Sequence, residues 1–286
     1  MTHRSRSLLE VTVIYIGLFV IGTAVYAWMD TDAMIRCLVA DLVMTVGIYA
    51  VSVWKRNTSA YDAYWSVIPF YFVAWLGWQY ASHWSVYQWG IVLAVSYWSW
   101  RLTLNWTRSW PGWEHEDWRY VNYRNQLGKR FELMNFFGLQ MAPTLMVFGG
   151  FSPLFAVLSE GEPTMSAIPG VALMFLGTTL ELIADNQLYA FRARENPSPT
   201  ELLDHGIWGI VRHPNYLGEL LFWTGAAACG LTHGAAWYTV LGVASITATV
   251  LFASIPFKDD RMASRRPQFE AYRQRVPALI PGIHWP

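Results

Sequence analysis

Long apolar runs separated by short polar segments dominate the chain. Most runs approach the roughly 20 residues that a helix needs to cross the hydrocarbon core of a bilayer. The runs span residues 8–28, 37–54, 63–80, 86–107, 135–158, 166–190, 216–231 and 236–256. This pattern predicts an all-α integral membrane protein with eight crossings. The short run 216–231 is also compatible with a tilted or re-entrant helix that lines a polar cavity.

The amino-acid composition supports a membrane location. Hydrophobic residues make up 54% of the chain and charged residues 14%, against roughly 25% charged residues in an average soluble domain. The 17 Trp and 15 Tyr residues suit the headgroup region, where amphipathic rings gather. The formal net charge is zero, so electrostatics do not favour nucleic acid as a partner. We expect membrane lipids and a lipophilic small molecule as partners, and no protein partner is evident.

The positive charges predict the orientation. If the N-terminus lies inside, Arg36 is in an outer loop and Arg101 is within a run, while the other Lys and Arg residues fall on the cytoplasmic side, as membrane proteins prefer. Both termini of this multi-pass protein are then cytoplasmic. Run 8–28 lacks a small-residue cleavage site, so we interpret it as a retained helix.

The remaining organisation is simple. Residues 1–286 show no internal repeat or linker, which predicts a single transmembrane domain. The tail "RMASRRPQFEAYRQRVP" predicts a short amphipathic helix with Phe269, Tyr272 and Val276 on one face. A surface helix bound to anionic headgroups is the alternative interpretation of this segment.

Ionisable residues inside the apolar runs are candidate site residues, because a charge in lipid requires a partner or water. "WSWRLTLNWTR" places Arg101 and Asn105 on one helical face, and "ELIADNQLYAFR" does the same for Glu181, Asp185 and Arg192. These groups predict a polar cavity near the cytoplasmic side. A structural ion pair of Asp185 with Arg192 or Arg101 is the alternative.

The segment "RHPNYLGE" places a third group of polar residues at the start of an apolar run, here the run 216–231. It contributes Arg212, His213, Asn215, Tyr216 and Glu219. Its proline presets the first turn of a helix, so Asn215 and Glu219 share one face.

Asp62 begins another run, between Tyr61 and Tyr64. It is either a helix cap or a group that protonates or hydrogen-bonds a ligand within the membrane.

Absent motifs narrow the chemistry. The chain has no GxGxxG, GxxxxGK[ST], HExxH or GxSxG motif, and its two cysteines lie in apolar runs. His213 has no second histidine or cysteine at ligand spacing, so we expect no metal site. A bound nucleotide must then be held by side chains such as arginine, which matches phosphate in a bidentate manner.

With these residues in view, the chain resembles the steroid 5-alpha-reductase family of membrane NADPH-dependent reductases. The resemblance runs from about residue 57 to 283, through "WSWRLTLN", the Asp185 and Arg192 pair, "RHPNYLGE" and "FEAYRQRVPALIPG". It implies a seven-helix core within 37–286, an additional helix at 8–28, and cytoplasmic loops that close a cofactor pocket. The cofactor-binding residues it implies, together with their polar neighbours, are Arg101, Asn105, Asp185, Arg192, Arg212, His213, Asn215, Tyr216, Glu219 and Arg261.

Two positions depart from the family pattern. Asp62, seven residues before Pro69, stands where the family has a catalytic glutamate, and Trp98 stands where it has a catalytic tyrosine. Tyr97 is adjacent to Trp98. The catalytic candidates are therefore Asp62, Tyr61, Tyr64 and Tyr97.

The function that the resemblance implies is NADPH-dependent reduction of a carbon–carbon double bond conjugated to a carbonyl, in a steroid- or isoprenoid-like substrate. The RHPNYxG motif is also similar to that of sterol C14 and C7 reductases and isoprenylcysteine methyltransferases. The alternatives are therefore an S-adenosylmethionine-dependent membrane methyltransferase and a non-enzymatic lipid-binding or transport protein. Repeated halves with discontinuous helices, which are typical of transporters, are not visible in the sequence.

Overall fold

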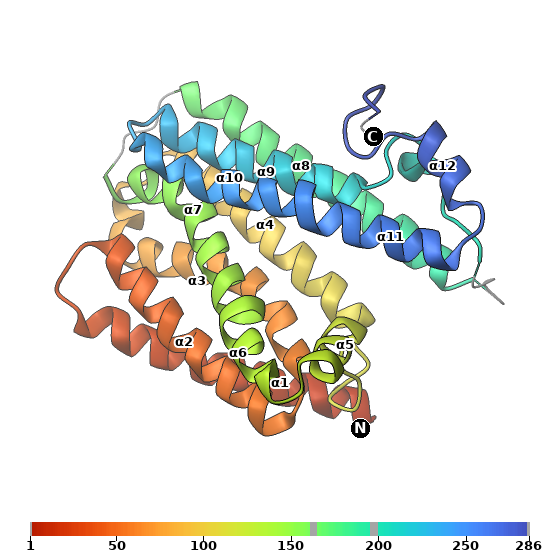
Figure 1. Cartoon of the computed structure of the whole chain (residues 1–286). Helices are drawn as coiled ribbons and strands as arrows, with labels where there is room; N and C mark the ends of the chain where they lie inside the picture. Colours follow the sequence, from red (N-terminus) through yellow and green to blue (C-terminus); the bar gives the residue numbers. More distant parts are fainter. Residues whose placement is uncertain (1, 161–164, 195–199, 285–286) are drawn as a thin grey trace.

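A computed structural model describes residues 2–160, 165–194 and 200–284, and within these ranges all regular secondary structure is helical. The predicted all-α class is thus confirmed. Figure 1 shows the long helical segments packed into one bundle. They are α1 (His3–Trp28), α2 (Ala33–Lys55), α3 (Tyr61–Tyr80), α4 (Val86–Ser109), the continuous α6 (Phe131–Leu133), η4 (Met134–Met141) and α7 (Ala142–Glu160), α8 (Ile168–Arg192), α9 (Pro214–Leu231), and the continuous α10 (Val240–Thr249), η8 (Val250–Ser254) and α11 (Ile255–Arg265).

Short elements connect these segments. The two short α-helices, α5 (Trp118–Leu127) and α12 (Phe269–Arg275), lie at one end of the bundle. The 3-10 turns are η1 (Thr58–Ala60), η2 (Ala81–His83), η3 (Gly128–Arg130), η5 (Met165–Ala167), η6 (Gly206–Gly209) and η7 (Trp237–Thr239).

Within the described residues, five helical segments are long and apolar enough to cross a membrane, by length and composition. This makes the chain a multi-pass integral membrane protein. The segments are His3–Trp28, Ala33–Lys55, Trp118–Ser159, Met165–Arg192 and Trp237–Arg265. The other long helices, α3, α4 and α9, each carry a buried or half-buried ionisable side chain, and their crossing of the membrane stays a prediction.

Two predicted boundaries differ from the structure. The run expected to end at residue 256 continues helically to Arg265, because the π-helical turn η8 precedes Pro256, which occupies the first turn of α11. The predicted C-terminal amphipathic helix is divided, since α11 ends at Arg265 and α12 begins after Pro267. The predicted apolar face nevertheless forms: Phe269, Tyr272 and Val276 cluster with Leu202 and Met262.

Helix α1 packs against the rest of the bundle. The Arg4 guanidinium donates to backbone carbonyls at the end of α4, including those of Arg108 and Trp110, where the helix dipole favours a positive charge. Tyr15 donates its hydroxyl hydrogen to the Ala60 carbonyl. The two termini lie at the same end of the bundle, on the right in Figure 1, whereas their cytoplasmic location stays a prediction.

Glycines bring α8 and α9 unusually close together. A side chain at Gly177 would collide with the Gly218 carbonyl and the Phe222 amide nitrogen, and one at Gly225 would meet the Gly170 carbonyl. Small residues at helix interfaces let membrane helices approach closely. This contact places the acidic residues of α8 close to Glu219, the one acidic residue of α9.

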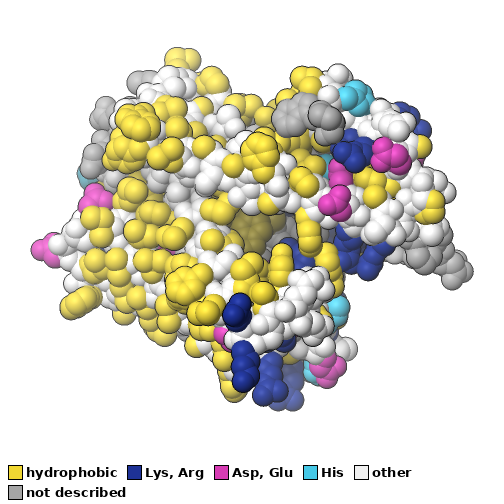
Figure 2. All heavy atoms as spheres, viewed as in Figure 1, with side chains coloured by type: hydrophobic (Ala, Val, Ile, Leu, Met, Phe, Trp, Pro, Cys, Tyr) yellow, Lys and Arg dark blue, Asp and Glu magenta, His cyan; other side chains and the backbone are white. Residues whose placement is uncertain are grey.

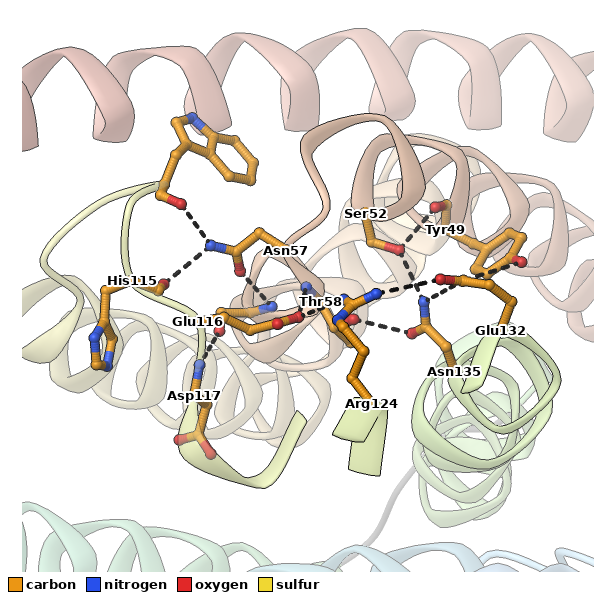
Figure 3. A network of polar contacts seen from close by, with 12 residues as sticks. Tyr49, Ser52, Asn57, Thr58, His115, Glu116, Asp117, Arg124, Glu132 and Asn135 are labelled. Carbon is orange, nitrogen blue, oxygen red and sulfur yellow. Dashed lines mark hydrogen bonds and ion pairs between the residues drawn. The ribbon is translucent and has the colours of Figure 1, made fainter. Parts of the chain in front are cut away.

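A polar network fixes the segment before α5 against the start of α3 (Figure 3). Asn57 donates to the carbonyls of Trp113 (2.8 Å) and His115 (3.0 Å). Glu116 accepts from the Thr58 amide and from the Arg124 guanidinium, both at 2.9 Å. The network therefore fixes the position of α5 relative to α3.

Candidate functional site

Arg101 of α4 is the centre of a buried ionic cluster. Its side chain is 3% exposed and donates to Asp185 (2.7 Å) and to Glu181, both on α8. Glu219 of α9 lies 3.8 Å away. The structure thus brings together Arg101, Asp185 and Glu219, three of the predicted cofactor residues, and the alternative of an ion pair between Asp185 and Arg101 is also present.

Two indoles hold the Glu219 carboxylate. The Nε1–H groups of Trp98 and Trp223 donate to its two oxygens, at 3.1 and 2.8 Å. Trp223 follows Glu219 by one helical turn, and Trp98 stacks on Phe222 at 4.9 Å between ring centres. Trp98 is therefore a neighbour of the cluster, in the position where the family resemblance places a tyrosine.

The cluster is not balanced in charge. Arg101 faces three carboxyl groups, which would leave a negative excess if all were ionised. An uncompensated buried charge is costly, so a proton, a cation or a hydrogen-bond donor must complete the site. Among the described residues of the cluster and the start of α9, the acceptors Glu181 Oε1 and Asn215 Oδ1 and the donor Arg101 Nε are buried without a hydrogen-bond partner. The two acceptors fit a ligand that presents N–H donors or positive charge.

Asp62 does not cap α3. The cap residue is Ala60, and the Asn57 side chain caps the preceding turn η1. Instead, the Asp62 carboxylate accepts a hydrogen bond from the Tyr120 hydroxyl of α5 and lies 3.9 Å from the Arg119 guanidinium. The interpretation as a cap is thus wrong, because α3 continues directly from η1. Asp62 remains 20% exposed, so it is accessible to a ligand.

Tyr61 and Tyr64 lie in a separate buried network. The Tyr64 hydroxyl donates to Asp41 of α2 (2.9 Å), and the Tyr61 hydroxyl is 2.7 Å from that of Thr144 in α7. These groups face α2 and α7, whereas Asp62 faces α5. The structure therefore separates both tyrosines from Asp62.

Tyr97, the fourth catalytic candidate, lies between α4 and α8. Its hydroxyl is 3.5 Å from that of Thr179, and its ring stacks on Phe175 with 6.1 Å between ring centres. It is one residue from Trp98 but does not share the contacts of Trp98 with Glu219.

Arg212 and His213 fasten the C-terminal segment. Arg212 donates to Asp259 (2.9 Å) and to the Val276 carbonyl (2.7 Å), and His213 pairs with Asp259 at 2.9 Å. Their backbone amides donate to the carbonyls of Pro277 and Ala278. Burial lowers the pKa of His213 despite its contact with Asp259. Both residues therefore have a structural role, because they fix the C-terminal segment against the start of α9.

A pocket of about 780 Å³ lies between α5 and α11. The Arg261 guanidinium sits 3.2 Å above the Trp118 ring, which stacks on Phe257 at 5.4 Å. Figure 2 shows this face hollowed near its centre, with Lys and Arg side chains bordering the hollow. Arginine beside aromatic rings is a surface that suits a planar or anionic ligand.

The remaining predicted cofactor residues are Asn105, Arg192 and Tyr216. Asn105 is half-buried on α4, Arg192 is exposed at the end of α8, and Tyr216 stacks on His213. The Lys258 ammonium lies 4.3 Å from the Tyr216 ring centre.

The sequence analysis missed three residues of these arrangements. Asp41 is an ionisable residue inside an apolar run, so the rule for charges in lipid would have found it. Trp223 carries only the weaker signal of its i+4 spacing from Glu219, which places both side chains on one face of the helix. Tyr120 carries no such signal, because it reaches Asp62 from 58 residues away in sequence.

Comparisons with known proteins find one relative that matches over most of this chain and two that match over about a third of it. An uncharacterised protein of Schizosaccharomyces pombe is 26% identical over 90% of this chain and 83% of its own length. A probable 7-dehydrocholesterol reductase of Acanthamoeba polyphaga mimivirus is 30% identical over 30% of this chain and 19% of its own. The mouse delta(14)-sterol reductase is 33% identical over 29% of this chain and 20% of its own.

The similarity to the two sterol reductases thus spans about a fifth of each enzyme. No solved structure matches the chain. Residues 48–276 match the family described as "Protein of unknown function (DUF1295)". Because this match covers most of the chain, the protein belongs to the DUF1295 family.

Proposed function

We propose that the protein is an NADPH-dependent membrane oxidoreductase that reduces a carbon–carbon double bond conjugated to a carbonyl in a steroid- or isoprenoid-like substrate. The observation that carries this proposal is the buried Arg101 cluster with its two partnerless acceptors, Glu181 Oε1 and Asn215 Oδ1. The partial similarity to two sterol reductases supports the same chemistry.

NADPH, when bound, supplies the hydride and contains groups that fit the residues present. Its carboxamide has two N–H groups, and Glu181 Oε1 and Asn215 Oδ1, which have no hydrogen-bond partner, would accept hydrogen bonds from them. Its phosphates require positive charge, which Arg192, Lys258 and Arg261 would provide. Arg101 is engaged by carboxylates, so its role is to hold Glu181, Asp185 and Glu219 in place rather than to bind phosphate.

The proton donor in this proposal is the pair formed by Asp62 and Tyr120. A hydrogen bond to the substrate carbonyl oxygen would stabilise the negative charge that develops there during reduction. The phenol hydroxyl of Tyr120 already contacts Asp62, so the pair contains both the carboxyl and the tyrosine that the family resemblance implies. In this proposal Tyr120, rather than the sequence candidate Tyr97, is the catalytic tyrosine.

The spacing of Asp62 and Arg101 is compatible with one shared substrate. Helices α3 and α4 are linked by Ser66 and Thr103, whose hydroxyl oxygens are 3.0 Å apart. Asp62 lies four residues to one side of this contact and Arg101 two residues to the other. At 1.5 Å per residue, they are roughly 9 Å apart along the helix axes.

Turnover of an enone tests this function. The purified protein in detergent or nanodiscs should oxidise NADPH when a 4-en-3-one sterol is added, and should be inactive with the corresponding saturated 3-ketone. Product analysis by mass spectrometry should show a gain of two hydrogens. NADPH oxidation that is equal with both ketones would contradict enone reduction.

A methyltransferase is the second candidate function, and the charge excess of the cluster favours it. Three carboxyl groups around one guanidinium would also suit the sulfonium and ammonium groups of S-adenosylmethionine. The arginines at the cytoplasmic end, which S-adenosylmethionine does not require, favour NADPH.

We also propose that the chain crosses a bacterial inner membrane eight times, with both termini in the cytoplasm. The shared location of the termini at one end of the bundle supports this arrangement. A phosphatase reporter fused to the C-terminus should stay inactive, since that reporter requires the periplasm. An active fusion would contradict this topology.

A further inference from the structure

A groove on the surface between α3 and α4 is separate from the Arg101 cluster. Its volume is about 360 Å³, within the roughly 300–1,000 Å³ of small-molecule sites. It faces the opposite side of α4 from Trp98 and Arg101, because its residues follow another stripe of the helix. The lining residues are Val67, Phe70, Ser96, Ser99, Trp100, Thr103, Leu104 and Thr107.

Ser99 is the polar group of the groove that requires a partner. Ser99 is among the lining residues, it is 4% exposed, and its hydroxyl oxygen is buried without a hydrogen bond. By contrast, Thr103 pairs with Ser66 at 3.0 Å and Thr107 donates to the Leu104 carbonyl at 2.8 Å. A buried hydroxyl without a partner is unfavourable, so the geometry calls for an oxygen on the occupant.

The uncharged lining of the groove favours a neutral ligand. No Lys, Arg, Asp or Glu is among the lining residues, so a charged headgroup would find no counter-charge in the groove. Phe70 and Trp100, which also line the groove, are each about half exposed (47% and 57%), as expected of side chains that face lipid. The lining extends from Ser96 to Thr107, about 16 Å along α4, which is long enough for an extended ring system or chain.

We propose that the α3–α4 groove binds a neutral sterol or isoprenoid lipid that carries one hydroxyl or carbonyl oxygen, and that Ser99 forms the hydrogen bond to that oxygen. This site does not depend on the reductase function, because none of its lining residues belongs to the proposed cofactor or proton-donor groups.

Photoaffinity labelling in nanodiscs tests the site. The probe is a cholesterol analogue with a diazirine on its ring system, and the reference probe is a phosphatidylcholine with a diazirine on its acyl chain. The sterol should label peptides within 60–80 and 86–109, and unlabelled cholesterol should compete. Ser99→Ala should weaken competition roughly three- to tenfold, the loss expected for one hydrogen bond.

Thr107→Val is the matched control, since this threonine lines the same groove but its hydroxyl already has a partner. It should leave competition within about twofold of the unmodified protein. Equal labelling of the groove by both probes would show ordinary contact with bilayer lipid and overturn the proposal. Equal effects of Ser99→Ala and Thr107→Val, or sterol labelling confined to other helices, would also overturn it.

Discussion

Replacing Arg101 with methionine should destabilise the protein by about 3–5 kcal/mol, the usual cost of removing one partner from a buried ionic group. The substitution keeps most of the side-chain volume but leaves Glu181 and Asp185 without their counter-charge. The measurement is the melting temperature of the detergent-solubilised protein.

Two variants make the Arg101 result specific. Arg108→Met, on the same helix, removes an exposed arginine that contacts Asn186 and should change the melting temperature little. Adding Glu181→Gln to Arg101→Met should recover part of the loss, because it removes one unpaired charge. If Arg101→Met and Arg108→Met have the same melting temperature, the Arg101 charge does not stabilise the buried carboxylates, which would contradict this prediction.

Replacing Asp62 with asparagine should reduce enone turnover by about 10²–10³, the usual effect of losing one hydrogen-bond donor to a developing oxyanion. An amide cannot deliver a proton and is a far weaker acid than a carboxyl group. Folding and NADPH binding should remain close to those of the unmodified protein, because Asp62 does not cap α3.

Tyr120→Phe should slow the same step, since it removes the hydroxyl that contacts Asp62. Asp117→Asn is the comparison variant: asparagine keeps the cap of α5 on the Arg119 amide and removes only the charge that pairs with the Arg119 guanidinium at 2.8 Å. It should therefore lower turnover far less than Asp62→Asn. Turnover of Asp62→Asn within a few-fold of the unmodified protein would exclude the pair as the acid and direct attention to Tyr97.

The apolar runs of the sequence predicted the helices well, because a helix that crosses a bilayer needs a continuous apolar run of about 20 residues. It predicted the ends less well where local backbone geometry decides them. The turn η8 lets the helix that contains Pro256 continue to Arg265, and no hydropathy pattern carries that information.

The candidate site was predictable where a charge interrupts an apolar run. Arg101, Asp185 and Glu219 do so, and the structure brings them together. Arg212 and His213 gave the same sequence signal but point to Asp259 and the C-terminal segment. The sequence shows that a buried charge needs a partner, whereas the fold decides which partner it finds.

The acid candidates show a second limit of sequence analysis. Tyr61, Asp62 and Tyr64 are neighbours in sequence, but a helix turns adjacent side chains to different faces. As a result, Tyr61 and Tyr64 point to Thr144 and Asp41, and Asp62 meets Tyr120 of a distant helix.

The most direct test of the central claim is differential stabilisation of the purified protein by NADPH and by S-adenosylmethionine. NADPH at about 100 times its dissociation constant should stabilise the protein by about 2.7 kcal/mol, and S-adenosylmethionine should have no effect. Arg192→Ala should weaken NADPH binding by about 1.5–3 kcal/mol, the value of a hydrogen bond to a charged group. Stabilisation by S-adenosylmethionine without any response to NADPH would contradict the reductase and support the methyltransferase.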